Sequence, residues 1–251
     1  MTRTPLIAGN WKMHTTSAEA RELAGAVAAR SMAADDREVL LAPPFTALRD
    51  VAEEVSGSRI IIAAQNVCWE EKGAFTGEIS PAMIKDCGAS CAIVGHSERR
   101  QIFNESDEMI NKRLLGALSF GLQVILCVGE TLDEREDNRT FEILETQVRA
   151  GLQEVSLQLT ANVVIAYEPV WAIGTGKTAS TEQAQESHSF IRGLVEKMYE
   201  KTIADQMRIL YGGSVKPANV DELMAQADID GALVGGAALD AESFGRIIAF
   251  E

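Results

Sequence analysis

A glutamate followed by proline and a glycine-rich run is the stretch of this sequence best suited to chemistry. Glu168 comes one residue after residues 162–166, an apolar segment of the kind found in buried strands. Pro169 favours extended backbone at Glu168 and has no amide hydrogen of its own. The Gly-Thr-Gly tip at 174–176 makes residues 169–179 typical of a loop that moves between two stiffer ends. The stretch therefore predicts a carboxylate base with a lid attached.

Two other interpretations of this stretch stay open. Glu168 could pair with a surface lysine at the end of a strand, and a glycine-rich loop need not be a lid. The triplet Gly176-Lys177-Thr178 also matches the end of a phosphate-binding P-loop, but that motif requires glycine at the position of Trp171. We therefore disfavour the P-loop.

A histidine and a lysine near other strand ends could complete a site for proton transfer. His96 follows Gly95, where a neutral ring can donate a hydrogen bond to a carbonyl oxygen. Lys12 lies just beyond Asn10 and can offset negative charge on a substrate, with Glu98 as the partner that orients it. The alternatives are a structural histidine and a solvated surface lysine.

Glycines near the C-terminus predict a phosphate site. Gly212, Gly213, Gly235 and Gly236 let the backbone approach a ligand closely, and Ser214 follows the first pair. The same glycines could serve only to turn the chain tightly. A base, a neutral electrophile, a cation and a phosphate site together favour proton abstraction beside a carbonyl, through an enediolate. That reaction requires no metal and no organic cofactor.

Eight short runs rich in Val, Ile, Leu and Ala must position these residues. The runs lack polar alternation, which is typical of strands buried on both faces. They span residues 6–10, 39–42, 60–64, 91–94, 124–128, 163–167, 208–211 and 232–234.

The segments between these runs have helical spacing and recognisable helix starts. Proline stands near a first helical turn at Ser80-Pro81 and Lys216-Pro217. Capping boxes are predicted for the pairs Thr16 with Glu19, Thr131 with Glu134, and Ser180 with Gln183.

Eight strand–helix units without a linker predict one α/β domain over residues 1–251. The expected fold is a (β/α)8 TIM barrel, a single closed parallel eight-stranded barrel ringed by helices. An open doubly wound sheet is the alternative, although its GxGxxG fingerprint is absent after the first run. In a barrel, the carboxyl ends of all strands lie at one face, so we expect the chemical residues to meet at one mouth.

The charge, apolar runs and cysteines of the chain limit its possible binding partners and its cellular location. The 251 residues carry a formal net charge of -14, which argues against a nucleic-acid partner. No apolar run approaches the roughly 18 residues of a membrane span, and the N-terminus lacks a signal-peptide pattern, so we expect no membrane partner and a cytoplasmic location. The cysteines lack the paired spacing of disulfide or zinc frameworks and are expected to be reduced: Cys68, Cys87, Cys91 and Cys127.

Seven motifs in order resemble the triosephosphate isomerase family over essentially the whole chain. They are Gly9-Asn10-Trp11-Lys12, Gly73-Ala74-Phe75-Thr76-Gly77-Glu78, Val94-Gly95-His96-Ser97-Glu98-Arg99-Arg100, Cys127-Val128-Gly129-Glu130, Ala166-Tyr167-Glu168-Pro169-Val170-Trp171-Ala172-Ile173-Gly174-Thr175-Gly176, Tyr211-Gly212-Gly213-Ser214-Val215 and Gly231-Ala232-Leu233-Val234-Gly235-Gly236.

The resemblance implies interconversion of dihydroxyacetone phosphate and glyceraldehyde 3-phosphate, a triose phosphate substrate. It implies that Glu168 moves the proton, that His96 is the neutral electrophile, and that Lys12 and Asn10 stabilise the oxyanion. Tyr211 would latch the lid. The implied phosphate ligands are Gly174, Ser214, Gly235 and Gly236.

The resemblance also implies a homodimer. Residues 65–78 form a long connection tipped by Phe75, an apolar side chain that would be a liability on a monomer. In the family this loop, including Thr76, reaches beside the partner's active site.

Two departures from the family pattern are His14, where asparagine is more frequent, and Ala238, where serine is common. His14 and His188 receive no chemical role, and whether Cys127 does more than pack stays open. The rival functions are another phosphate-binding barrel, such as a sugar-phosphate epimerase or a synthase, and a barrel that serves only as a scaffold.

Overall fold

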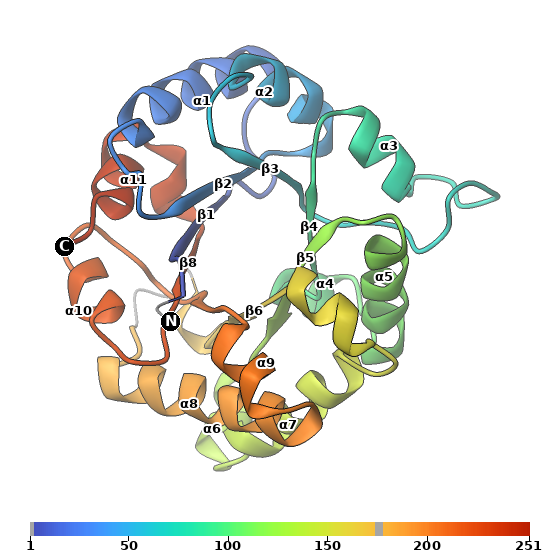
Figure 1. Cartoon of the computed structure of the whole chain (residues 1–251), viewed down its shortest axis with the longest axis vertical. Helices are drawn as coiled ribbons and strands as arrows, with labels where there is room; N and C mark the ends of the chain where they lie inside the picture. The colour runs from blue at the N-terminus through green and yellow to red at the C-terminus, as the bar shows by residue number, and fades with distance from the viewer. Residues whose placement is uncertain (1–2, 174–177) are drawn as a thin grey trace.

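The chain forms a closed barrel of parallel strands, as predicted. The structure is a computed structural model, and within the residues that it describes, 3–173 and 178–251, eight strands pair in sequence order and β8 closes against β1 (Figure 1). The strands are β1 Leu6–Asn10, β2 Glu38–Ala42, β3 Ile61–Ala64, β4 Cys91–Val94, β5 Gln123–Val128, β6 Val163–Tyr167, β7 Ile209–Tyr211 and β8 Gly231–Val234.

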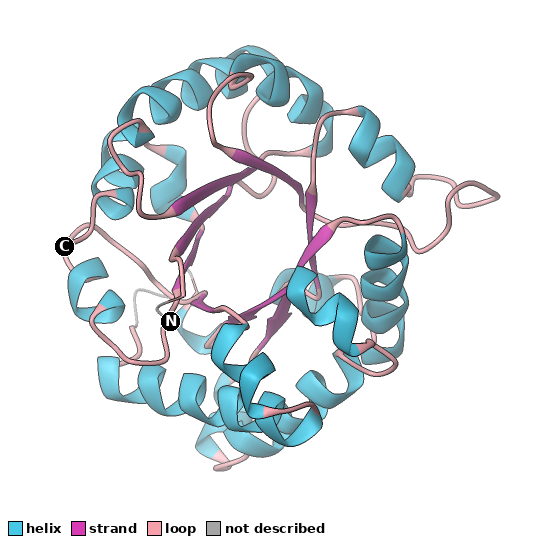
Figure 2. Cartoon of the chain, in the orientation of Figure 1, coloured by secondary structure: helices cyan, strands magenta, loops and turns pink. Residues whose placement is uncertain are grey.

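Helices ring the barrel on its outside (Figure 2). They are α1 Ser17–Ser31, α2 Leu48–Glu54, α3 Pro81–Asp86, α4 Ser97–Ile102, α5 Asp107–Ser119, α6 Leu132–Glu136, α7 Thr140–Gly151, α8 Thr181–Met198, α9 Lys201–Gln206, α10 Val220–Met224 and α11 Ala241–Ile248, with short 3-10 helices η1 Phe45–Ala47, η2 Leu157–Asn162, η3 Val170–Ala172 and η4 Gly236–Leu239. Across the two described ranges, no helix is both long and apolar enough to cross a membrane.

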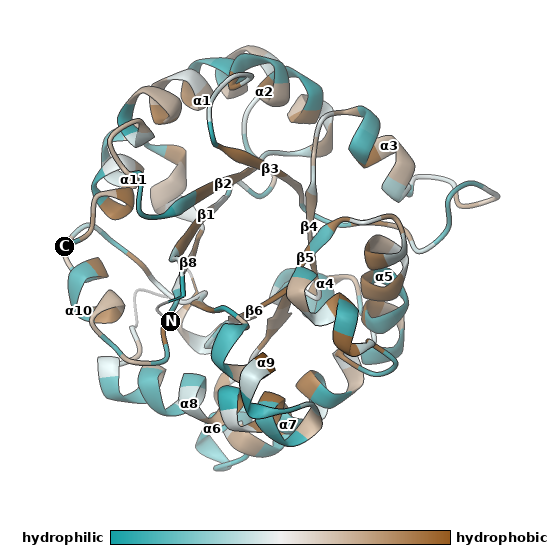
Figure 3. Ribbon diagram, viewed as in Figure 1, coloured by the Kyte–Doolittle hydropathy of each residue, from teal (hydrophilic) through white to brown (hydrophobic). Residues whose placement is uncertain are grey.

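Every predicted run became a strand, with boundaries that differ by one residue at most. The absence of polar alternation has the predicted cause, because both faces of the strands are buried. Outward side chains such as Ile7 and Ile165 join the core between barrel and helices. Inward side chains such as Leu6, Ile93 and Val164 fill the barrel. Figure 3 shows apolar strands inside a ring of helices that turn polar residues outward.

Local sequence signals set the helix starts. Capping boxes form at Thr16, Thr131 and Ser180, as predicted. Pro81 is the first residue of α3. Pro217 instead lies in a turn, and α10 begins three residues later at Val220.

Alternation along the strands sends the chemical residues toward the barrel mouth. Successive side chains of a strand point to opposite faces, so every second residue shares a side. On β6, Val164 and Ala166 fill the barrel interior, and Glu168 is next in that series. On β1, Leu6 and Ala8 lead in the same way to Asn10. The face that fills the barrel therefore also supplies the mouth.

A histidine without an assigned role lies fully buried behind two of these strand ends. The ring of His188, on α8, lies 5.6 Å from the Tyr167 ring and 6.1 Å from the Tyr211 ring, centroid to centroid. Its Nδ1 donates to the carbonyl oxygen of Ala184, 2.7 Å away. Burial lowers the pKa of His188 to about 4.

This buried ring predicts acid sensitivity of the fold. Below pH 6.5 the unfolded chain binds a proton at His188 that the folded chain refuses until pH about 4, so stability falls with pH in that window. Between pH 7 and pH 5 this costs about 2 kcal/mol. When the free energy of unfolding is measured in urea at both pH values, the decrease from pH 7 to pH 5 should be smaller by about that amount in His188→Gln than in wild type. The exposed control, His14→Gln, should follow wild type. A wild-type slope in His188→Gln would contradict the prediction.

Candidate active site

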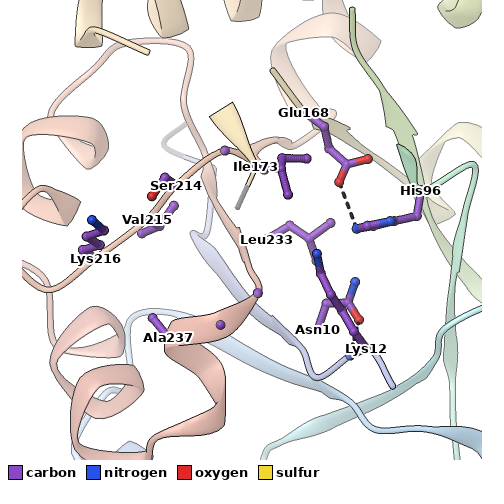
Figure 4. Close-up of a pocket in the computed structure, with 14 residues that line it drawn as sticks. Asn10, Lys12, His96, Glu168, Ile173, Ser214, Val215, Lys216, Leu233 and Ala237 are labelled. Carbon is purple, nitrogen blue, oxygen red and sulfur yellow. Dashed lines mark hydrogen bonds and ion pairs between the residues drawn. The ribbon is translucent and has the colours of Figure 1, made fainter. Parts of the chain in front are cut away.

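A single pocket at the carboxyl ends of the strands gathers most of the predicted site residues. Its volume is about 300 Å³. His96 and Glu168 lie at one end of it, and Ser214 lies toward the other (Figure 4). The lining residues are Asn10, Lys12, His96, Glu168, Ile173, Gly212, Gly213, Ser214, Val215, Lys216, Leu233, Gly235, Gly236 and Ala237.

Glu168 and His96 touch each other in this pocket. Glu168 Oε1 lies 3.0 Å from His96 Nε2, and the backbone amide of Ser97 donates to Glu168 Oε2 at 2.9 Å. The Glu168 side chain is 2% exposed. A carboxylate so deeply buried needs these partners to stay ionised.

The first turn of α4 fixes the tautomer of His96. His96 is the N-cap residue of α4, and its Nδ1 accepts a hydrogen bond from the Glu98 amide at 3.2 Å. A ring nitrogen that accepts carries no proton, so the neutral ring holds its hydrogen on Nε2. That hydrogen points at Glu168, into the space that a substrate would enter.

The two groups set each other's protonation. Burial acts to raise the pKa of Glu168, but the adjacent His96 ring and the Ser97 amide prevail and lower it. Burial acts to lower the pKa of His96, but the Glu168 carboxylate raises it above its ordinary value. A ligand that enters between them removes the raising contact. Burial and the N-terminus of α4 then favour the neutral imidazole.

Backbone geometry holds Lys12 at the mouth. Lys12 adopts a left-handed backbone conformation with φ of 54°. Its amide donates to Asn10 Oδ1 at 3.0 Å, and its carbonyl oxygen accepts from Gln65 Nε2 at 2.8 Å. Its ammonium group pairs with Glu98 Oε1 at 2.7 Å. Asn10 thus positions the lysine backbone, a role the sequence did not show.

Two glycines permit the close packing around Glu168. A Cβ at Gly129 would lie 1.7 Å from the Glu168 carbonyl oxygen, and one at Gly212 would lie 2.8 Å from Glu168 Cγ. The backbone pairs there too, since the Glu168 amide donates to Val128 O at 2.8 Å. Gly129 belongs to one of the seven motifs, but the only sequence signal for this packing role is a glycine at the end of a strand.

A second buried carboxylate anchors the segment that follows Glu168. Glu130 is fully buried and accepts from Tyr167 Oη at 3.2 Å, Trp171 Nε1 at 2.9 Å and Arg135 at 3.0 Å. Its carbonyl oxygen accepts from the Val170 amide at 3.1 Å. Sequence reasoning missed this network, because it joins residues that only the packing of β5 against β6 brings together.

Two glycine-containing loops form the other end of the pocket. The loop after β7 supplies Gly213 and Ser214, and the loop after β8 supplies Gly235 and Gly236 at the start of η4. Tyr211 packs under the first loop, where a Cβ at Gly213 would lie 2.2 Å from its hydroxyl oxygen.

Three of the predicted site residues are not seen at the pocket, either because they lie far from it or because they fall outside the described residues. Gly174 falls outside the described residues. Phe75 and Thr76 are on the exposed loop between β3 and α3, which projects away from the barrel (Figure 1). The two residues that depart from the family pattern do not line the pocket: His14 is exposed, and Ala238 is buried next to Gly9.

One of the free cysteines lies beside the site. Cys127 is fully buried, and burial, then the neighbouring Glu168 carboxylate, raise the pKa of its thiol well above 9. Within residues 3–173 and 178–251, no cluster of three His, Cys, Asp or Glu side chains is arranged to hold a metal ion.

Comparison with known proteins points to one family. A family model described as triosephosphate isomerase matches residues 5–251. The triosephosphate isomerase of Syntrophotalea carbinolica is 55% identical over 249 residues, which cover 99% of each chain. That of Geotalea uraniireducens is 53% identical over 248 residues, with the same coverage, and that of a Thermoanaerobacter species is 52% identical over 246 residues, covering 98% of this chain and 99% of the relative.

Proposed function

The chain belongs to the triosephosphate isomerase family and interconverts dihydroxyacetone phosphate and glyceraldehyde 3-phosphate, and we propose that the pocket at the barrel mouth is where this reaction takes place. One observation carries the proposal: a single pocket holds His96 and Glu168, 3.0 Å apart, and the glycine loops that follow β7 and β8. The family is itself an established example of a glutamate base that works with a neutral histidine and a closing loop, so these roles come from the family.

Glu168 is the proposed base. Its carboxylate takes a proton from C1 of dihydroxyacetone phosphate. The electrons of that C–H bond form the C1–C2 double bond, and the π electrons of the C2 carbonyl move onto its oxygen to give an enediolate. Return of the proton to C2, with transfer of the C1 hydroxyl proton to the C2 oxygen and formation of a carbonyl at C1, gives glyceraldehyde 3-phosphate. Glu168 contacts His96 in the free protein, and we propose that the bound triose replaces this contact.

His96 is the proposed electrophile and Lys12 the proposed counter-charge. The hydrogen on His96 Nε2 is free to bond the substrate oxygens once Glu168 turns to the substrate carbon. A neutral ring suits this task, because its Nε2 hydrogen can be donated to the oxygens of the enediolate for as long as the enediolate is bound. The Lys12 ammonium, held by Glu98, offsets the charge that develops on oxygen.

The loops after β7 and β8 are the proposed phosphate site. Support comes from their place in the pocket opposite Glu168, and from glycines that leave the backbone amides accessible. Ser214, Gly235 and Gly236 are the proposed ligands there. Gly174 is proposed as a further ligand only because the family resemblance in the sequence implies it.

Water must be kept from the enediolate, because a phosphate beside it can be eliminated in solution. We propose that residues 169–179 close over the bound triose, as their composition predicts. The hydrogen bonds of Glu130 to Val170 and Trp171 support this proposal, because they anchor one end of the segment to the loop after β5.

The proposed assembly is a homodimer in the cytoplasm. Large apolar side chains in the segments that follow β1, β3 and β4 support it: Met13, Phe75, Ile102 and Phe103 are exposed by 93%, 38%, 67% and 63%. Such a surface favours burial against a second copy. Free cysteines among the described residues fit a reducing compartment.

Shortening the proposed base tests the site. Glu168→Asp withdraws the carboxylate by one methylene and should lower kcat about 100-fold or more, because reacting atoms tolerate little misplacement. The assay converts purified glyceraldehyde 3-phosphate to dihydroxyacetone phosphate. The exposed control Glu196→Asp should match wild type, and circular dichroism should show both variants folded. Full turnover by Glu168→Asp would remove Glu168 from the mechanism.

A charge at the tip of the projecting loop tests the dimer. Thr76→Arg should yield monomers in sedimentation velocity and lower turnover about 100-fold, because the loop then no longer packs beside a partner's pocket. Thr146→Arg, an equal change at an exposed position of α7, should leave mass and turnover unchanged. Full activity in monomeric Thr76→Arg would refute a functional dimer.

A further inference from the structure

The substrate and the protein carry charge of the same sign. The chain has a formal net charge of -14, and a phosphate monoester carries about -1.5 to -2 at neutral pH. The long-range field of the protein therefore opposes approach of the substrate. Local positive charge at the mouth must offset that field.

The charged residues proposed to do the chemistry leave little free positive charge. The Lys12 ammonium is paired with Glu98, and His96 contacts Glu168. Lys216 also lines the pocket and is exposed. Among the described lining residues, it is the one lysine with no carboxylate within 4 Å of its ammonium group.

The backbone of Lys216 is fixed between the phosphate loop and α10. Its amide donates to Asn219 Oδ1 at 2.8 Å, and Asn219 Nδ2 donates to Ser214 O at 3.0 Å. Pro217 then restricts Lys216 to extended geometry. Asp221, on α10, is paired with Arg246.

Figure 4 places Lys216 beyond Ser214 and Val215, at the end of the pocket away from His96 and Glu168. That is the end proposed for the phosphate. The charge therefore lies beside the end of the pocket that is proposed to hold the phosphate group.

We propose that Lys216 attracts the triose phosphate dianion to the mouth and so sets the rate of productive encounter. The inference rests on the proposed phosphate end of the pocket. The effect is a long-range attraction that acts while the substrate approaches and binds, before the chemical step. It should therefore appear in kcat/KM and be screened by salt, whereas kcat should not depend on it.

Steady-state kinetics with glyceraldehyde 3-phosphate at about 0.01 M and about 0.5 M ionic strength test the inference. At low ionic strength, Lys216→Gln should lower kcat/KM about 3- to 10-fold with kcat unchanged, and the loss should fall below about 2-fold at high ionic strength. Lys216→Arg keeps the charge and should retain wild-type kcat/KM.

The matched control is Lys197→Gln. Lys197 is exposed near the C-terminal end of α8, away from the mouth, so this variant makes the same charge change and should match wild type at both salt concentrations. An unchanged kcat/KM in Lys216→Gln at low salt, an equal loss at both salt concentrations, or a loss shared by Lys216→Arg would overturn the inference. Turnover by the wild-type protein in the same assay reports separately on the proposed function.

Discussion

The site depends on one constraint: a carboxylate must stay ionised at a position that is almost wholly buried. Glu168 loses most of its hydration there, and it is compensated by the His96 ring and the Ser97 amide. The same contacts bring the proposed base and electrophile together. A ligand that parts them lowers the proton affinity of the histidine and frees the carboxylate at the same time. In the proposed mechanism, the electrostatic compensation of the free protein therefore also places the base and the electrophile for the reaction.

The barrel satisfies this constraint through its regular geometry. Alternation carries the inward series of β6 directly to Glu168, and parallel pairing brings the ends of β5 and β7 against it. Gly129 and Gly212 are needed because any side chain there would overlap the glutamate. Stability and chemistry therefore use the same strand ends, and the glycines are part of the site although they carry no reactive group.

Much of this organisation could be predicted from the sequence, because its signals are local. Strands buried on both faces appear in the sequence as unbroken apolar runs. Helix caps such as Thr16 and Ser180 bond to residues within four positions, so they too can be recognised from the sequence. The contacts of Ser97 with Glu168 and of Glu130 with Trp171 could not be predicted, since they join distant segments. The free charge of Lys216 was equally hidden, because it depends on which carboxylates find other partners.

The most direct measurement of the central claim is a crystal structure of the protein with a non-reactive analogue of the enediolate phosphate. We predict that the analogue's oxygens lie between His96 Nε2 and the Glu168 carboxylate, so that their separation exceeds the 3.0 Å of the free protein, with the phosphate on the loops after β7 and β8. An analogue bound elsewhere, with the contact between His96 and Glu168 intact, would contradict the account.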